Sequence, residues 1–180
     1  MYKQIFITLF TSLLLISCNT EDPYLITATS VGPLTQETTV DELKTIFAKE
    51  KVVDENSEEG LQSRSNAIEI YDGDKQLLSL TPSTKEKNST IKNIQIFDER
   101  YKTSEGIGLK STFKDIKNAY KITKIETLLS SIVVFVDDIN AYFTIDKKQL
   151  PSEMQFDFSG KVDAVHIPDN AQIKYFMIGW

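Results

Sequence analysis

An uncharged apolar run from Ile5 to Ile16, followed at once by the chain's single cysteine, most limits what this sequence can fold into. The run is shorter than the roughly 20 residues that a membrane-spanning helix needs. With Lys3 before it, the run is typical of a secretory signal peptide, which is removed from the mature protein. We therefore assign residues 1–17 to a signal peptide and exclude them from the fold.

The four residues Leu15-Ile16-Ser17-Cys18 match the bacterial lipobox, which predicts cleavage between Ser17 and Cys18 and acylation of the Cys18 thiol. The alternative, a cysteine without a role inside the leader, is disfavoured because this lone cysteine stands where the lipobox needs it. Each buried methylene of an acyl chain contributes about 0.8 kcal/mol, so several chains make attachment to a membrane permanent. Residues 18–24 then form a lipidated tether, and a body without a free thiol depends on burial for its stability.

Length and charge limit the body further. Residues 25–180 fit a single globular domain. The formal charge of the chain is −6, and an acidic chain lacks the basic surface that nucleic acid requires as a partner. Asn19 is not the aspartate that retains many lipoproteins in the inner membrane, which favours the outer membrane. The short acidic pair Glu21-Asp22 leaves the periplasmic and surface faces both open.

An internal similarity organises the body. The nine residues from Thr39 to Phe47 align with those from Thr112 to Tyr120, 73 positions later, as Thr, apolar, any residue, acid, apolar, Lys, polar, apolar and aromatic. A threonine followed three positions later by an acid is a capping box, so both segments are predicted to begin short helices. We interpret the similarity as a duplicated helix-plus-hairpin unit, with pseudo-repeats at about 31–105 and 106–180.

Beyond each predicted helix the apolar residues alternate, as they do in half-buried strands. Ala67 to Tyr71 and Gln76 to Leu80 flank an Asp-Gly turn and predict one hairpin; Ile132 to Val136 and Ala141 to Ile145 predict a second. The fold class is therefore α+β, mostly antiparallel β-sheet with two short helices. Further strands are expected at 91–97, 155–158, 162–167 and 173–178, and polar loops at 51–66 and 81–90.

Motifs for catalysis, metals and cofactors are few. His166 is the only histidine, so the common His-based triads and multi-histidine metal sites are excluded, although His166 and Asp169 could share a metal. The acid pairs Asp72 with Asp74 and Asp137 with Asp138 fall at predicted turns, where aspartate is favoured by its backbone hydrogen bonds. Gly106-Ile107-Gly108 lacks the rest of a phosphate loop. No catalytic, metal or cofactor site is predicted, and the chain is not expected to be an enzyme.

Several aromatic residues in the second half admit two interpretations. They either line a binding groove or pack in the core, and alternating aromatics on strands favour the core. The final Trp180 is expected to be ordered by a closing strand. The residues concerned are Tyr142, Phe143, Phe156, Phe158, Tyr175, Phe176 and Trp180.

The order of short motifs resembles the envelope-stress (RpoE) regulated lipoprotein family of Gram-negative bacteria, which carries a domain of unknown function. After the lipobox, the matching pieces are Val31-Gly32-Pro33-Leu34-Thr35, Ile94-Gln95-Ile96-Phe97-Asp98, Gly106 to Asp115, Phe156 to Gly160 and Ile167 to Asn170, before a closing strand with Ile173 and Trp180. The chain departs from the family in lacking the cysteines that some relatives carry in the second half. The resemblance implies an outer-membrane lipoprotein and no catalytic residues.

The anchor and the absence of a catalytic set together predict a membrane-anchored, non-enzymatic module that binds or assembles an envelope component. Its partners are expected to be the membrane, through acyl chains on Cys18, and an envelope protein. The alternative is a cell-surface receptor for a small ligand or glycan, which would use exposed aromatic residues. A carboxylate-based hydrolase is a third hypothesis, and it needs two facing acids in a cleft, one of them with a raised pKa.

Overall fold

An eight-stranded antiparallel sheet forms the centre of the computed structural model, which describes residues 22–54, 66–155 and 161–180. In spatial order its strands are β4 (Lys51–Asp54), β5 (Ile68–Asp72), β6 (Lys75–Pro82), β7 (Ile91–Ile96), β12 (Tyr175–Gly179), β11 (Ala141–Asp146), β10 (Ser131–Val136) and β9 (Lys124–Thr127). Both predicted hairpins are confirmed, because β5 pairs with β6 and β10 pairs with β11. The mostly antiparallel α+β class is confirmed with them.

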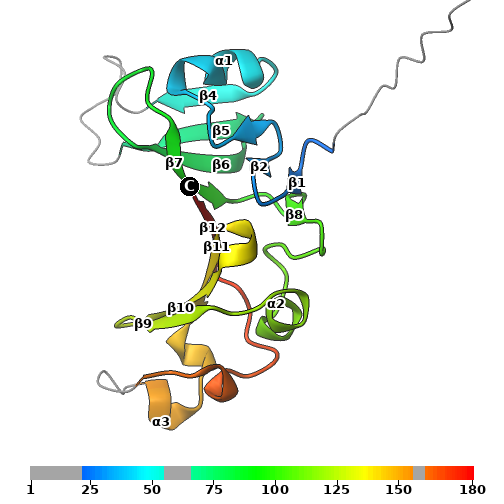
Figure 1. Ribbon diagram of the computed structural model, residues 1–180, viewed down its shortest axis with the longest axis vertical. Helices are drawn as coiled ribbons and strands as arrows, with labels where there is room; N and C mark the ends of the chain where they lie inside the picture. Colours follow the sequence, from blue (N-terminus) through cyan, green and yellow to red (C-terminus); the bar gives the residue numbers. More distant parts are fainter. Residues whose placement is uncertain (1–21, 55–65, 156–160) are drawn as a thin grey trace, which may run out of the picture.

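A second, four-stranded sheet covers one face of the large sheet, on the right in Figure 1. Its order is β3 (Leu34–Thr35), β2 (Ser30–Val31), β1 (Leu25–Ile26) and β8 (Lys102–Thr103). Strand β8 runs parallel to β1, with Leu25 opposite Lys102. This pairing places the start of the body against the segment that joins its two halves.

The helices are short. The first consists of a 3-10 turn, η1 (Val40–Glu42), continued by α1 (Leu43–Ile46), and the second is α2 (Phe113–Ala119) on the covered face of the sheet (Figure 1). The remaining elements are η2 (Asp137–Ile139), η3 (Lys147–Gln149), α3 (Ser152–Gln155) and η4 (Ala164–His166). No helix among the described residues is both long and apolar enough to cross a bilayer.

Both predicted capping boxes are present. The Glu42 carboxylate accepts the backbone N–H of Thr39 at 2.8 Å, and the Asp115 carboxylate accepts that of Thr112 at 2.7 Å. Each reciprocal bond satisfies a backbone donor that the start of a helix leaves unpaired. The apolar side chains behind the caps, led by Leu43 and Phe47 in one helix and by Phe113 and Ile116 in the other, enter the core.

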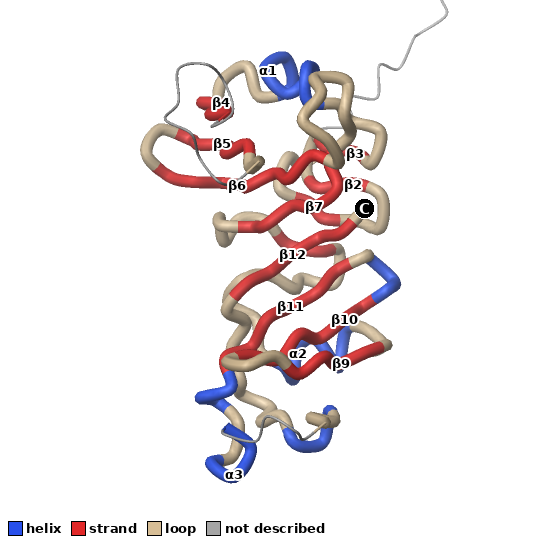
Figure 2. The backbone as a smooth tube through the Cα atoms, turned by 90° about the vertical axis from the view of Figure 1, so that its left-hand side faces the viewer, coloured by secondary structure: helices blue, strands red, loops and turns tan. Residues whose placement is uncertain are grey.

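The main core cluster of the described residues lies on one side of the large sheet. Alternate strand residues pack there against α2 and the small sheet, as the two-residue period of a strand requires. They include Ile70, Leu80, Ile94 and Ile96 from the first half and Val134, Phe143, Ile145, Phe176 and Ile178 from the second. In Figure 2 the opposite side of the sheet faces the viewer, and no described helix or strand lies in front of it. We call this side the open face.

The two halves of the large sheet follow the same plan. In each, a capped helix precedes four consecutive antiparallel strands, and the last strands β7 and β12 pair at the centre, with Gln95 opposite Met177. The hydrogen bonds that hold each helix start also correspond. Val40 N–H donates to the Ser89 carbonyl at 3.0 Å, as Phe113 N–H does to that of Ala171 at 2.8 Å.

Three expectations about the strands differ from the structure. Residues 162–167 form no strand, because a turn closed by the His166 N–H on the Asp163 carbonyl at 3.0 Å makes the 3-10 helix η4. Gln155 ends α3, and the rest of the strand expected at 155–158 lies outside the described residues. The loops expected at 51–66 and 81–90 are partly strand, since β4 occupies 51–54 and β6 reaches Pro82.

Candidate functional site

The open face carries a continuous set of aromatic and polar side chains across five strands. Lys124 on β9 lies opposite Phe135 on β10, Phe135 lies opposite Tyr142 on β11, and Tyr142 lies opposite Met177 on β12. Met177 in turn lies opposite Gln95 on β7. Residues directly opposite each other in a sheet share a face, so these side chains form one row on the open side.

The rings of Phe135 and Tyr142 stack at the middle of this row. Their centroids are 5.7 Å apart and their planes differ by 23°. The Lys124 ammonium lies 5.5 Å from the Phe135 centroid on the other side, within the range of a cation–π contact. The same ammonium forms an ion pair with Glu126 on its own strand, so the carboxylate of Glu126 balances the positive charge at this end of the row.

Tyr142 extends across β12 toward β7. Its hydroxyl accepts a hydrogen bond from the Asn93 side-chain amide, although Asn93 lies opposite Gly179 rather than opposite Tyr142. A Cβ added to Gly179 would come within 3.5 Å of the ring atom Cε1 of Tyr142. Gly179 therefore lies directly beside the Tyr142 ring, at an ordinary van der Waals distance. We call Asn93, Gly179, Tyr142, Phe135 and Lys124 the aromatic platform.

On the covered side, the buried carboxylate of Asp98 binds the arginine that contacts Tyr24. Asp98 is fully buried and accepts hydrogen bonds from Arg100 Nε at 3.0 Å and Nη2 at 2.7 Å, with Lys75 Nζ at 3.2 Å. Burial raises the pKa of Asp98, but the hydrogen bonds from Arg100 and Lys75 outweigh burial and lower the pKa to about 2. Asp98 is thus an ionised anchor for Arg100, which also reaches Asp72 at 3.1 Å.

Arg100 in turn holds Tyr24. The guanidinium carbon lies 4.3 Å from the centroid of the Tyr24 ring, whose edge meets the ring of Tyr101 at 5.1 Å and 88°. Lys102 N–H donates to the Tyr24 carbonyl at 3.1 Å. Tyr24, Asp98, Arg100, Tyr101 and Lys102 therefore fix the end of the predicted tether to the body, and we call them the tether junction.

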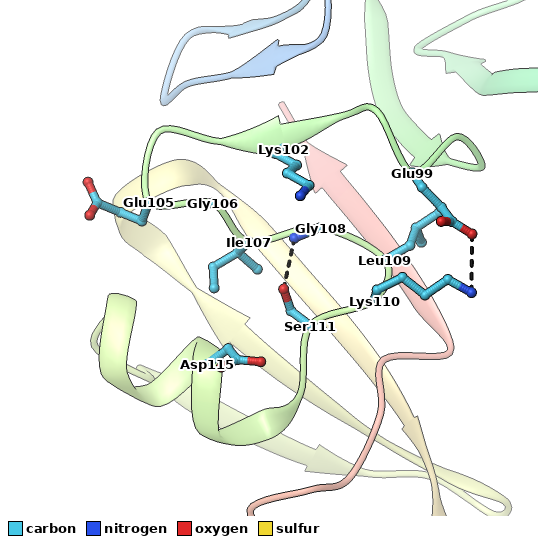
Figure 3. A pocket seen from close by; sticks show the side chains of 10 residues that line it. All are labelled: Glu99, Lys102, Glu105, Gly106, Ile107, Gly108, Leu109, Lys110, Ser111 and Asp115. Carbon is cyan, nitrogen blue, oxygen red and sulfur yellow. Dashed lines mark hydrogen bonds and ion pairs between the residues drawn. The ribbon is translucent and has the colours of Figure 1, made fainter.

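A hollow of about 380 Å³ lies between the segment after β8 and the start of α2 (Figure 3). Of its charged groups, Lys110 pairs with Glu99 at 3.1 Å, and Asp115 caps α2. The backbone amide of Thr112 lowers the pKa of Asp115, whereas a general acid needs a raised pKa. Glu99, Lys110 and Asp115 therefore make structural contacts, and none of the predicted aromatic residues lines the hollow.

The other carboxyl groups with a clear shift behave in the same way. The pKa values of Glu42 and Asp146 are lowered first by backbone amides, and that of Asp169 by a hydrogen bond from Lys117. Each acid therefore serves as an ionised acceptor. None of them has the raised pKa that the hydrolase hypothesis requires.

The singled-out polar residues are not brought together. The His166 Nδ1 atom accepts the Asp163 N–H at 3.3 Å, while Asp169 pairs with Lys117. The described residues contain no group of three or more His, Cys, Asp or Glu that would hold a metal ion. Asp72 and Asp137 lie at turns as predicted, and accept from Arg100 and from the Thr123 hydroxyl respectively.

The aromatic residues divide between the two predicted roles. Phe143 and Phe176 are fully buried, with ring centroids 4.7 Å apart in the core. Tyr142 belongs to the platform, and Tyr175 is 43% exposed on the open face. Trp180 is ordered, as predicted, by a hydrogen bond from its backbone N–H to the Lys92 carbonyl at 2.8 Å. Phe156 and Phe158 lie outside the described residues.

Sequence reasoning missed Phe135, Asn93, Gly179 and Lys124 as members of a site. The alternation of β10 contained a signal for Phe135, because that residue falls out of phase with the buried Ile132, Val134 and Val136. No local signal marks Asn93 or Gly179. Their neighbours in the platform come from strands far away in the sequence.

The chain is similar to the uncharacterized protein yfeY from Escherichia coli, known from a crystal structure, with a TM-score of 0.53. The match covers 86% of this chain and 99% of that chain, at 12% sequence identity. The two chains share a fold. No family model matches the sequence, and no curated protein does. At this identity the similarity concerns the fold alone.

Proposed function

We propose that this chain is a lipid-anchored bacterial envelope protein that binds an envelope component through its open face and catalyses no reaction. The observation that carries this proposal is the tether junction. Tyr24 is fixed to the body by Arg100 and Lys102, six positions after the lipobox cysteine. Six residues span at most about 20 Å when fully extended, so an acylated Cys18 keeps the body close to the bilayer.

The tether junction also supports a proposed orientation of the body on the bilayer. Tyr24 precedes β1 of the small sheet, on the covered side of the large sheet (Figure 1). A short tether from that side brings the small sheet toward the lipid and directs the open face away from it. The open face is therefore the surface available to a partner in the aqueous compartment.

The outer membrane is the proposed location, and the envelope-stress regulated lipoprotein family the proposed family. The lipobox, Asn19 after Cys18 and the ordered motifs from Val31 to Trp180 support both proposals. The shared fold with the Escherichia coli protein agrees with a Gram-negative origin. A cell-surface receptor for a small ligand or glycan is the second candidate, favoured by the aromatic platform on the open face.

Cellular fractionation tests the anchor. The parent chain and a Thr20→Ser control, which leaves the lipobox intact, are expected in the membrane fraction. The Cys18→Ser variant is expected to remain unprocessed or to be released. A Cys18→Ser chain that is processed and fractionates as the parent does would contradict the proposal.

Photo-crosslinking in cells tests the binding face. A crosslinking amino acid at Thr144, on the open face, is expected to capture an envelope component. The same group at the exposed Glu105, on the side of the small sheet, serves as the matched control and is expected to capture lipid or nothing. Capture of the same component only from position 105 would overturn the proposed orientation.

We also propose that the two halves of the body arose by duplication of a helix followed by four strands. The equivalent hydrogen bonds at Val40 and Phe113 and the central pairing of β7 with β12 support this origin. Superposition of the two halves of an experimentally determined structure tests it. Halves whose helices and strands superpose in the same chain order are expected, and a different order would refute the duplication.

A further inference from the structure

The aromatic platform has the chemistry that proteins use to hold carbohydrate. A pyranose ring presents an apolar face of C–H groups and a polar edge of hydroxyls. It therefore needs an aromatic ring to cover the face, and amide or hydroxyl groups to bind the edge. Tyr142 and Phe135 supply stacked rings, and the side chains of Asn93, Gln95 and Thr144 supply polar groups on the same face.

The platform is extended in one direction. Its members lie on β7, β12, β11, β10 and β9, five neighbouring strands. Neighbouring strands are about 4.8 Å apart, so the four intervals between them span roughly 19 Å across the sheet. A ligand that matches this row is a linear chain of several units lying across the strands. A single compact molecule would use only part of it.

Charge and the position of the predicted tether disfavour a polyanion and a lipid bilayer as occupants of the same row. Lys124 is the cation at its end and is already paired with Glu126, which disfavours a polyanion in a chain of net charge −6. The membrane that would hold the lipid anchor is also disfavoured as the occupant, because Tyr24 precedes β1 on the opposite, covered side of the sheet. An uncharged polymer in the aqueous compartment fits both observations.

Between the amides and the rings, Met177 adds an apolar group. It lies opposite Gln95 on one side and Tyr142 on the other, in the centre of the sheet. An acetamido substituent has an amide, which pairs with the side chain of Gln95, and a methyl group, which packs on the Met177 thioether. This combination favours an N-acetylated amino sugar over an unsubstituted hexose.

We propose that the open face binds a linear chain of N-acetylated amino sugars, the uncharged backbone of a cell-wall glycan, with Tyr142 as the stacking ring. This inference rests on the proposed function, since it names the partner of the same face. The chain lies across β9 to β7, and its acetamido groups meet Gln95 and Met177. Asn93 is a positioning residue, because its side-chain amide donates a hydrogen bond to the Tyr142 hydroxyl.

Calorimetric titration of the full lipoprotein in nanodiscs with β-1,4-linked N-acetylglucosamine hexamer tests the inference, and a glucose hexamer of the same linkage is the comparison ligand. The amino-sugar hexamer is expected to bind several-fold more tightly than the glucose hexamer. Tyr142→Ala is expected to weaken binding about tenfold or more, as for loss of a central aromatic contact. Tyr142→Phe keeps the ring and is expected to stay within a few-fold of the parent.

Tyr71→Ala provides the matched control, because Tyr71 is a tyrosine on β5 outside the platform. It is expected to bind as the parent does. Absence of binding by the parent at millimolar hexamer, equal binding of both hexamers, or full binding by Tyr142→Ala would each overturn the inference. Crosslinking from Thr144 to an envelope protein alongside absent hexamer binding would sink the glycan while leaving the proposed function standing.

Discussion

At the scale of single residues, Asp98 shows how the body holds the segment around Tyr24, the end of the predicted tether. Its carboxylate is removed from water, which alone would favour the neutral form, yet Arg100 and Lys75 keep it charged. A buried charge is tolerated when partners satisfy its oxygens and becomes costly when they are removed. The stability of the junction therefore depends on this acid remaining ionised.

Replacement of Asp98 by Asn should remove that contribution. The pKa of Asp98 is lowered from 3.8 to about 2, a shift equivalent to about 2 kcal/mol of folding stability. The contribution is complete above the unfolded pKa and is lost as the pH falls through the folded pKa. Chemical denaturation should show Asp98→Asn less stable by about 2 kcal/mol at pH 7 and a shrinking difference between pH 4 and pH 2. A difference independent of pH would contradict this account.

Gly32 is required at its position for two reasons. Its φ is +54°, and a Cβ there would lie 2.2 Å from the Pro23 carbonyl oxygen. Gly32→Ala should therefore cost about 2–4 kcal/mol in denaturation experiments, through left-handed strain and overpacking together. Gly73 has a similar φ of +60° with open space around it, so Gly73→Ala should cost only about 1 kcal/mol. Equal losses in the two variants would rule out the contact with Pro23.

At the scale of elements, the sequence predicts those helix caps and hairpins that depend on a few consecutive residues. The caps at Thr39 and Thr112, the hairpin at Asp72-Gly73 and the hairpin between β10 and β11 each depend on a few consecutive residues, and all are present. Strands β4 and β9 were missed because each is only four residues long. The strand predicted at 162–167 was wrong. Its apolar residues alternate as in a strand, but Asp163 begins a turn that makes the 3-10 helix η4.

The candidate site was less accessible to sequence reasoning. Tyr142 was singled out, but its partners depend on register: Asn93 is 49 positions earlier, and β7 pairs with β12 across about 80 positions. Such pairings follow from the packing of two half-sheets and not from any local pattern. The assignment of Phe143 to the core and Tyr142 to the open face also required knowing which side of the sheet is covered.

The caps permit a direct test at this scale. Thr112→Ala removes the side chain that accepts the Asp115 N–H and should cost about 1 kcal/mol of stability. Asn118→Ala, at an exposed position of the same helix without a capping role, should change stability by less than about 0.5 kcal/mol. Thermal or denaturant unfolding measures both. A control as destabilised as Thr112→Ala would mean that capping is not the cause.

At the scale of the whole molecule, the described helices and small sheet cover one side of the large sheet and leave the other open, and Tyr24 lies on the covered side (Figures 1 and 2). If the body is anchored through Cys18 as proposed, this asymmetry gives it a defined orientation on the bilayer. Because the only cysteine is the one proposed to be acylated, a second cysteine introduced elsewhere carries the only reactive thiol. Its distance from the lipid can then be compared between sites.

Energy transfer to labelled lipid tests the orientation. A dye on Glu105→Cys, on the side of the small sheet, should transfer energy to an acceptor lipid more efficiently than the same dye on Thr144→Cys, on the open face. The protein is used in its lipidated form, in vesicles containing the acceptor. Higher transfer from position 144 would place the open face against the bilayer and reverse the proposed arrangement.

The central claim is that acyl chains on Cys18 hold this folded body beside a membrane. The intact mass of the protein purified from its native host tests that claim most directly. The account predicts a chain that begins at Cys18 and carries the added mass of a diacylglyceryl group, with or without a further acyl chain on its amino terminus. A chain that retains residues 1–17 with an unmodified thiol at position 18 would contradict it.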